Sequence, residues 1–275
     1  MRHNNDFNEL VSLLNIGDNN GKLCCIAGRP AMGKSALMIS FALHCVQDKI
    51  PTAIFSLEMP NVKIVRRLIS SYSDLSTDKI SLGELTKEEC EDLEKMWKNL
   101  SDFPLFIDDT PGITIDEIKK KVRTLKEQRN IQVVIIDYLQ LINTDEIWTS
   151  RKDEVYYILR ELKHLSEDCQ ISIVILSQLS KLLQTVPPHF YNCWRQSLSK
   201  EYMRHSVDDA PVVCNTDYID FLAFIHRPFY YQRKNLPEQK NKFVEEPIMI
   251  IIENDQSGTQ EEYEFTFNNT TGSIY

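Results

Sequence analysis

The stretch Gly28-Arg29-Pro30-Ala31-Met32-Gly33-Lys34-Ser35 decides the fold, because it fits the pattern GxxxxGK followed by Ser or Thr. It directly follows an apolar run of strand length, Leu23–Ala27, and precedes a helical run, Ala36–Gln47. A strand, a glycine-rich loop and a helix in this order predict a phosphate-binding loop, because backbone N–H groups then converge on phosphate oxygens at the positive end of the helix. The alternative is a glycine-rich turn without a ligand. Glycine is scarce, at 8 in 275 residues, which makes a chance match less frequent.

The loop predicts a set of nucleotide contacts. The ammonium group of Lys34 should reach the β- and γ-phosphates, and the hydroxyl of Ser35 should hold Mg²⁺. The expected nucleotide-binding residues are those of the loop and the residue after it, Gly28, Arg29, Pro30, Ala31, Met32, Gly33, Lys34, Ser35 and Ala36.

Two carboxylates follow other apolar strands. Val133-Val-Ile-Ile-Asp137 ends in Asp137, and in P-loop enzymes a carboxylate in this place lies beside Mg²⁺. Taken alone this signal is weak, because many buried strands end in aspartate. Glu58 ends the stretch Phe55-Ser-Leu-Glu58-Met59, where it could deprotonate an attacking water or be a surface residue at a strand end. The residues themselves leave both interpretations of Glu58 open.

Apolar, β-branched runs recur along the chain and predict its fold. The expected strands are Leu23–Ala27, Thr52–Ser56, Leu105–Asp108, Val133–Asp137, Ile171–Ser177, Phe221–His226, Ile248–Ile252 and Tyr263–Phe267. The first five are continuous, so each is expected to be buried on both faces of a parallel sheet. Helix-period stretches lie between them, and the last two strands should form an antiparallel hairpin. The fold class is therefore α/β, with a mostly parallel sheet flanked by helices.

Helices and loops are expected between these strands. Thr114 and Glu117 form a capping-box pattern at the start of one helix, and residues 61–100 indicate two or three short helices. The segment Lys181–Pro211 indicates a long loop or a loop with a short helix, and Pro228–Pro247 indicates another loop. No linker divides the chain, so a single domain over residues 1–275 is expected.

Composition excludes several classes of protein. No apolar run approaches the roughly 18 residues of a membrane span, and the start MRHNNDFNEL lacks the apolar stretch of a secretory signal. Seven cysteines without a CxxC pair argue against a disulfide framework and favour a reducing, cytoplasmic location. The net charge of −9 is unfavourable for holding phosphate backbones, so any contact with nucleic acid must rest on local patches. Seven of the acidic residues lie in residues 243–275, which contain no Lys or Arg.

Five motifs together resemble one family. These are the loop Gly28–Ser35, FSLEM at Phe55–Met59, IDDTPG at Ile107–Gly112, IDYLQL at Ile136–Leu141 and LSQLSK at Leu176–Lys181. In order and spacing they are similar to the motifs of the carboxy-terminal motor domain of DnaB-type replicative DNA helicases. The resemblance is strong over residues 6–181 and weaker over 217–267.

This resemblance implies a RecA-like P-loop fold, ATP hydrolysis with Mg²⁺, ring-shaped hexamers and movement on single-stranded DNA. Carried over to this chain, Lys34 and Ser35 bind the phosphates and the metal, and Asp137 supports Mg²⁺. Glu58 activates water and Gln178 senses the γ-phosphate, which makes Glu58, Lys34 and Gln178 the expected catalytic residues. Judged as a residue alone, Gln178 could equally be a polar cap at the end of a strand.

The chain also departs from the family pattern. The amino-terminal domain that interacts with primase is not expected, because the chain begins almost at the motor core. The family's penultimate strand ends in a Lys-x-Arg pair that reaches the ATP site of the neighbouring subunit. The segment here is Ile252–Gly258 and contains no basic residue. Since an arginine finger contributes about 10³–10⁵ in turnover in other NTPases, its loss predicts slow hydrolysis or rescue by another subunit.

Basic residues interleaved with aromatic ones indicate a candidate contact with single-stranded DNA. These are Lys181, Arg195, Lys200 and Arg204, beside Tyr191, Trp194 and Tyr202. A solvated loop is the alternative. Two functions therefore follow: a DnaB-like helicase motor ATPase associated with DNA replication, or an ATP-binding, weakly hydrolysing assembly or regulatory partner. The expected partners are single-stranded DNA and further copies of the chain or a complete helicase.

Overall fold

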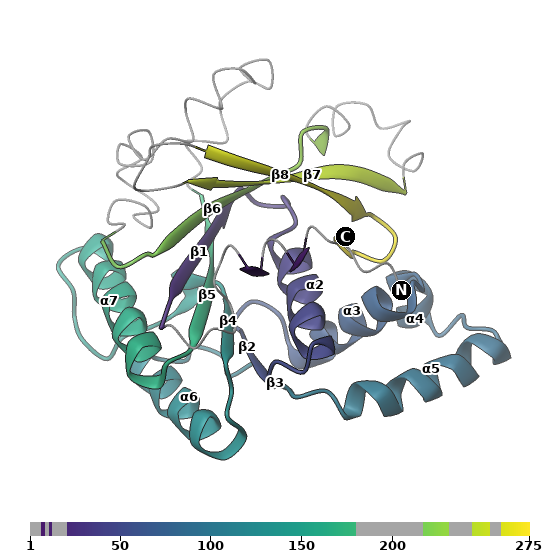
Figure 1. Ribbon diagram of the computed structural model, residues 1–275, viewed down its shortest axis with the longest axis horizontal. Coiled ribbons are helices and arrows are strands. Elements are labelled where there is room, and N and C mark those ends of the chain that lie inside the picture. The colour runs from purple at the N-terminus through teal and green to yellow at the C-terminus, as the bar shows by residue number, and fades with distance from the viewer. Residues whose placement is uncertain (1–6, 9–10, 13–20, 180–216, 231–243, 254–259) are drawn as a thin grey trace.

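The computed structural model describes residues 7–8, 11–12, 21–179, 217–230, 244–253 and 260–275. Within them, one eight-stranded sheet has the strand order β3-β2-β4-β5-β1-β6-β7-β8 (Figure 1). The parallel strands are β1 (Leu23–Gly28), β2 (Thr52–Ser56), β3 (Leu105–Asp108), β4 (Val133–Asp137), β5 (Ser172–Gln178) and β6 (Phe221–His226). β7 (Glu245–Glu253) runs antiparallel to β6 and to β8 (Gln260–Asn268). The expected parallel sheet and its antiparallel end are confirmed.

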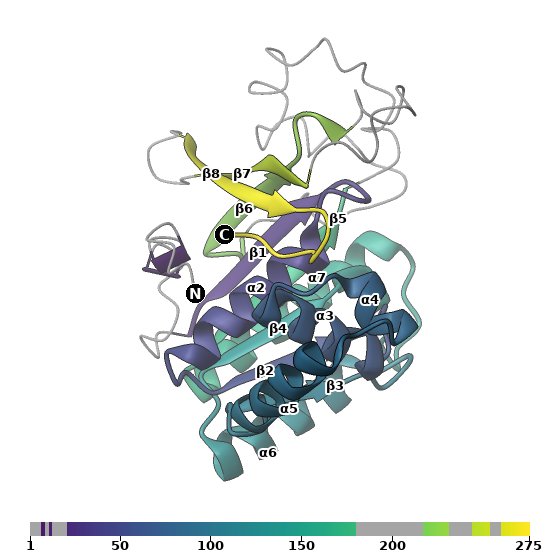
Figure 2. The same ribbon diagram turned by 90° about the vertical axis from the view of Figure 1, so that its right-hand side faces the viewer.

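Helices cover both faces of the sheet. In Figure 1, α6 (Ile115–Arg129) and α7 (Arg151–Cys169) lie on one side. On the other side lie α2 (Lys34–Gln47), α3 (Asn61–Ser73), α4 (Thr77–Leu82) and α5 (Lys87–Ser101), which Figure 2 shows stacked over the sheet. Alternate residues of β1 supply the two resulting cores. Leu23, Cys25 and Ala27 pack in the core that contains α6 and α7, while Cys24 and Ile26 pack in the core that contains α2.

The local signals in the sequence were largely sufficient to place the helices. Three helices fill residues 61–101, as expected. Thr114 Oγ1 accepts from Glu117 N, and Glu117 Oε2 accepts from Thr114 N at 2.9 Å, which is the predicted capping box. None of the helices in the described ranges is long and apolar enough to cross a membrane.

Two expectations about the strands are wrong. Leu105–Asp108 contacts the cores on both faces of the sheet but is not fully buried, since all four residues of β3 are only partly buried. The reason is topological, because β3 is the edge strand and pairs with β2 alone. The predicted end of the loop Pro228–Pro247 is also wrong, because residues Glu245 to Pro247 already belong to β7. At Pro247 the strand is paired only with β8, and pairing with β6 starts at Met249, so one side of the strand tolerates a residue without an N–H group.

The topology brings the sequence motifs to one edge of the sheet. Parallel strands end on the same side, and their register places Gly28 of β1 opposite Gln178 of β5. Ser56 of β2 lies opposite Asp137 of β4 in the same way. Ligands of open α/β sheets bind outside the carboxyl ends of the strands, so this edge is the place to look for a site.

Candidate nucleotide-binding site

The glycine-rich loop connects β1 to α2 at this edge. Gly33 has φ +96°, a conformation that residues with a Cβ rarely adopt. A Cβ on Gly28 would lie 2.4 Å from Cγ2 of Ile225, so glycine is needed for the close packing of β1 against β6. α2 then begins at Lys34 without a side-chain cap and without an acidic residue in its first turn. Its first N–H groups and the positive end of its dipole are thus available to an anion.

The residues of the loop do not all face a ligand with their side chains. Met32 is 1% exposed and Ala36 is 8% exposed, and both pack in the core on the α2 side. Pro30 has no N–H group to offer. Arg29 is buried, and its charge helps burial to lower the pKa of His226 to about 4, at the end of β6. Met32 and Ala36 can therefore contribute only backbone groups to nucleotide binding.

The side chain of Lys34 is hydrogen-bonded to the backbone of the loop. Its Nζ donates to the backbone oxygens of Gly28 at 2.8 Å and Arg29 at 2.9 Å. Burial lowers the pKa of Lys34 from its usual value to about 8, and the carboxylates of Asp137 and Glu58 oppose this change. A partly desolvated ammonium group beneath an anion site gains strength as a partner for phosphate.

Ser35 and Asp137 form the second contact of the site. Ser35 Oγ donates to Asp137 Oδ2 at 2.8 Å, and Asp137 is 1% exposed. The pKa of the Asp137 carboxyl is raised above its usual value, mainly by burial and also by the charge of Glu58. The hydrogen bond from Ser35 and the charges of Lys34 and Arg67 oppose this rise. A hydroxyl and a carboxylate are hard oxygen ligands of the kind that Mg²⁺ prefers, so this pair fits a magnesium site.

Glu58 lies on a tightly held turn between β2 and α3. Its side chain is exposed, and its charge raises the pKa of Asp137 and, after burial, that of Tyr138. Ser56 Oγ donates to Met59 O at 2.7 Å, and Leu57 N donates to Asp137 O at 2.8 Å. The turn that carries Glu58 is therefore tied directly to the strand that ends in Asp137.

Asp109 is a residue of this site that the sequence did not assign. It belongs to the IDDTPG motif after β3, and its Oδ2 accepts from Asn61 N at 2.7 Å. Asn61 is the first residue of α3, so Asp109 fixes the helix that follows the Glu58 turn. Arg67, further along α3, was likewise missed, because a single arginine in an amphipathic helix carries no pattern of its own. The IDDTPG motif was the one signal that could have found Asp109.

Arg227, directly after β6, connects the glycine-rich loop to the carboxy-terminal hairpin. Its Nη1 donates to Ala31 O at 3.2 Å and its Nη2 donates to Asn269 Oδ1 at 2.9 Å. The guanidinium group also pairs with Glu246 of β7 and lies 4.1 Å from the ring centroid of Phe267 in β8. Arg227 and Glu246 are 8% and 3% exposed. The loop thus rests on a buried ion pair.

We expect the variant Arg227→Met to lower the free energy of unfolding by about 3–5 kcal/mol, because the buried Glu246 carboxylate then loses its cation. Urea unfolding followed by circular dichroism measures the change. The double variant Arg227→Met/Glu246→Gln is the control and should recover most of the loss. Equal losses in the single and the double variant would show that the charge of this pair is not responsible.

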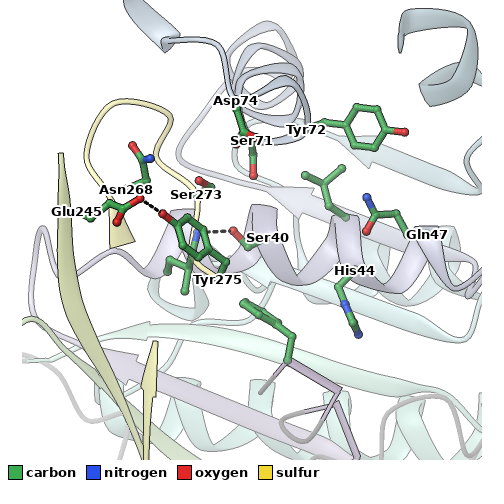
Figure 3. Close-up of a pocket in the computed structure, with 13 residues that line it drawn as sticks. Ser40, His44, Gln47, Ser71, Tyr72, Asp74, Glu245, Asn268, Ser273 and Tyr275 are labelled. Carbon is green, nitrogen blue, oxygen red and sulfur yellow. Dashed lines mark hydrogen bonds between the residues drawn. The ribbon is translucent and has the colours of Figure 1, made fainter. Parts of the chain in front are cut away.

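A separate pocket of about 410 Å³ lies at the other end of α2. Figure 3 shows Ser40 of α2 beside Tyr275, with Ser71 and Asp74 at the end of α3 on the other side of the pocket. Neither the glycine-rich loop nor any of the expected catalytic residues lines it. The pocket is therefore distinct from the candidate nucleotide site.

Some sequence expectations lie outside the residues that the structure describes. These are the DNA candidates Lys181, Arg195, Lys200 and Arg204, with Tyr191, Trp194 and Tyr202, the loop expected over Lys181–Pro211, and residues 254–258 of the segment expected in place of the family's Lys-x-Arg pair. They stay predictions. The described site brings Lys34, Ser35, Asp137, Glu58 and Gln178 to one edge of the sheet.

Comparisons with known proteins find similar sequences among replicative DNA helicases. Replicative DNA helicase DnaC of Bacillus subtilis (strain 168) is 31% identical over 248 residues, which cover 90% of this chain and 51% of that protein. A probable replicative DNA helicase of Trieres chinensis is 39% identical over 178 residues, which cover 64% of this chain and 39% of that protein. This chain thus spans about half or less of the length of these two relatives.

Solved structures share the fold. One, described as a DnaB-like replicative helicase and its interactions with primase, superposes with a TM-score of 0.75 at 24% identity over 93% of this chain and 57% of that chain. A second, described as an ATPase domain, gives a TM-score of 0.74 at 24% identity, over 92% of this chain and 84% of that one. The expected RecA-like architecture is confirmed. The family model of the DnaB-like helicase C-terminal domain matches residues 4–189, and the chain belongs to this family.

Proposed function

We propose that this domain binds ATP with Mg²⁺ at the glycine-rich loop and hydrolyses it, as the motor ATPase of a DnaB-like DNA helicase in DNA replication. One observation carries the proposal. Lys34, the Ser35–Asp137 pair and the turn bearing Glu58 lie together at the carboxyl edge of the sheet, around an uncapped helix N-terminus. This is the arrangement that a triphosphate with a divalent cation requires.

Binding would exchange contacts within the loop for contacts with the nucleotide. Lys34 Nζ now donates to two loop carbonyls, and phosphate oxygens would take their place. Ser35 Oγ and Asp137 Oδ2 would hold Mg²⁺. The metal, when bound, neutralises negative charge on the phosphates and favours the ionised form of Asp137.

Hydrolysis needs a base beside the attacking water. The Glu58 carboxylate would accept a proton from that water as its oxygen bonds to the γ-phosphorus. The bond between this phosphorus and the β–γ bridging oxygen breaks, and ADP and phosphate leave. Gln178, which lies opposite Gly28 at the end of β5, would contact the γ-phosphate and distinguish ATP from ADP.

One observation favours weak hydrolysis as a second candidate. The described part of the β7–β8 hairpin carries Glu245, Glu246, Glu261, Glu262 and Glu264, and no Lys or Arg lies anywhere after Lys242. A site that has to receive its finger from a neighbouring copy of this hairpin would receive no cation. In that case the chain would bind ATP and assemble with a complete helicase rather than unwind DNA alone.

The steady-state rate of ATP hydrolysis, measured in Mg²⁺ with and without single-stranded DNA, tests the proposal. We expect hydrolysis that depends on Mg²⁺ and rises when single-stranded DNA is added, because the family members are DNA helicases. Lys34→Ala provides the background rate. Hydrolysis no faster than this background, with or without DNA, rejects the motor function and leaves the ATP-binding partner. Mass measurement in solution with and without ATP tests whether copies of the chain assemble.

A further inference from the structure

We propose that Gln140 is a positioning residue for Gln178, the residue expected to contact the γ-phosphate. Gln140 lies in the 3-10 helix Leu139–Leu141 that follows β4, and its side chain reaches across to the end of β5. The proposal rests on the function proposed above and assigns a role to a residue outside the expected nucleotide and metal contacts.

The side-chain amide of Gln140 pairs with both backbone groups of Gln178. Gln140 Nε2 donates to Gln178 O at 3.0 Å, and Gln140 Oε1 accepts from Gln178 N at 3.3 Å. Nε2 also lies 3.2 Å from Ser177 Oγ, to which it donates. A primary amide has a donor and an acceptor at the same end, so one side chain can satisfy both groups.

This pairing takes the place of strand pairing, because the hydrogen-bonded ladder between β4 and β5 stops before it reaches Gln178. The ladder between β4 and β5 ends at Ile136 and Ile175, because the chain leaves β4 after Asp137. On the other side of β5, Gln178 pairs with Gly28, and Leu179 N donates to Gly28 O at 3.1 Å. Gln178 is therefore held from two sides, by the first residue of the glycine-rich loop and by the Gln140 amide.

Gln140 is itself held in place. Arg151, the first residue of α7, donates from Nη2 to Gln140 O at 2.8 Å, and Leu141 N donates to Tyr138 O at 3.0 Å. The 3-10 helix starts two residues after Asp137, so the same short segment carries the candidate metal ligand and the support of the sensor. These contacts fix the backbone of Gln178 relative to Asp137 and do not engage its side-chain amide, which would be available to the nucleotide.

The variant Gln140→Leu tests this role, because leucine has a similar size and no hydrogen-bonding group. We expect kcat for ATP to fall about 10- to 100-fold, since misplacing a catalytic group by about 1 Å has an effect of this order. KM for ATP should change little, because the loop and Lys34 stay in place. Gln128→Leu, the same change at an exposed position of α6, is the matched control and should leave both constants unchanged.

A double-mutant cycle separates positioning from a general loss of stability. In the Gln178→Ala background, Gln140→Leu should have no further effect on kcat, because Gln140 acts through Gln178. Additive losses, or a lower melting temperature with unchanged kcat, would overturn the proposal. Absence of ATP hydrolysis in the unmodified protein would reject the proposed function instead, and full activity of Gln178→Ala would reject the sensor role on which this inference depends.

Discussion

Replacing Glu58 with glutamine should lower the turnover of ATP by about 10²–10⁴-fold, the usual contribution of a general base, while ATP still binds. Glutamine has nearly the same shape, but its amide cannot accept a proton from water. The turn should survive, because its ties run through Ser56 Oγ, Leu57 N and Asn61 N rather than through the Glu58 side chain. Steady-state hydrolysis gives the turnover, and titration with a fluorescent ATP analogue gives the affinity.

The neighbours of Glu58 supply a second readout. Its charge raises the pKa of Asp137, so glutamine should lower that pKa and favour the ionised metal ligand. Loss of the same negative charge also weakens the attraction of Mg²⁺ to the site, so affinity for Mg²⁺ should not rise as turnover falls. Glu94→Gln, an exposed position on α5, is the matched control. Unchanged turnover in Glu58→Gln would mean that the residue is only a surface glutamate at a strand end.

Much of the fold could be predicted because its signals are local. Continuous apolar runs such as Val133–Asp137 and Thr52–Ser56 match the observed strands residue for residue, and the Thr114–Glu117 capping box marks a real helix start. The errors arise where position in the sheet overrides the local pattern. Leu105–Asp108 is as apolar as a central strand but lies at the edge, and neither its neighbours nor its exposure follow from its own residues.

The residues of the candidate site also fall into those that local sequence signals predict and those that depend on long-range contacts. Lys34, Ser35, Asp137 and Glu58 follow strands or lie in the loop, so parallel strand order alone brings them to one edge. Asp109, Gln140 and the Arg227–Glu246 pair depend on contacts across 48, 38 and 19 positions of sequence, and no spacing rule predicts them. Asp109 and Gln140 lie in the quoted motifs IDDTPG and IDYLQL, but the contacts by which they hold the site together could not be read from the sequence.

Replacing Lys34 with alanine is expected to weaken ATP binding by about 2–5 kcal/mol, the usual effect of removing one partner of a buried charged hydrogen bond. That is roughly 30-fold to several thousand-fold in Kd. The loss arises because the phosphates lose a cation, whereas the carbonyls of Gly28 and Arg29 would give up this donor on binding in any case. Equilibrium titration with the fluorescent analogue measures it, and Lys120→Ala, at an exposed position of α6, should bind as the unmodified protein does.

The pH dependence of binding isolates the charge of Lys34. Burial gives the free protein a Lys34 pKa of about 8, and the phosphates of bound ATP favour the protonated form and raise this pKa. Binding at higher pH must therefore take up a proton, so affinity is constant between about pH 7 and pH 8 and falls above pH 8 by at most about tenfold per pH unit. A phosphate monoester ionises near pH 6, so the nucleotide itself does not titrate in this range. The fall above pH 8 should be absent in Lys34→Ala, whose affinity is already low. A fall of the same steepness in that variant would assign the dependence to another group and remove the case for a charged Lys34 beneath the triphosphate.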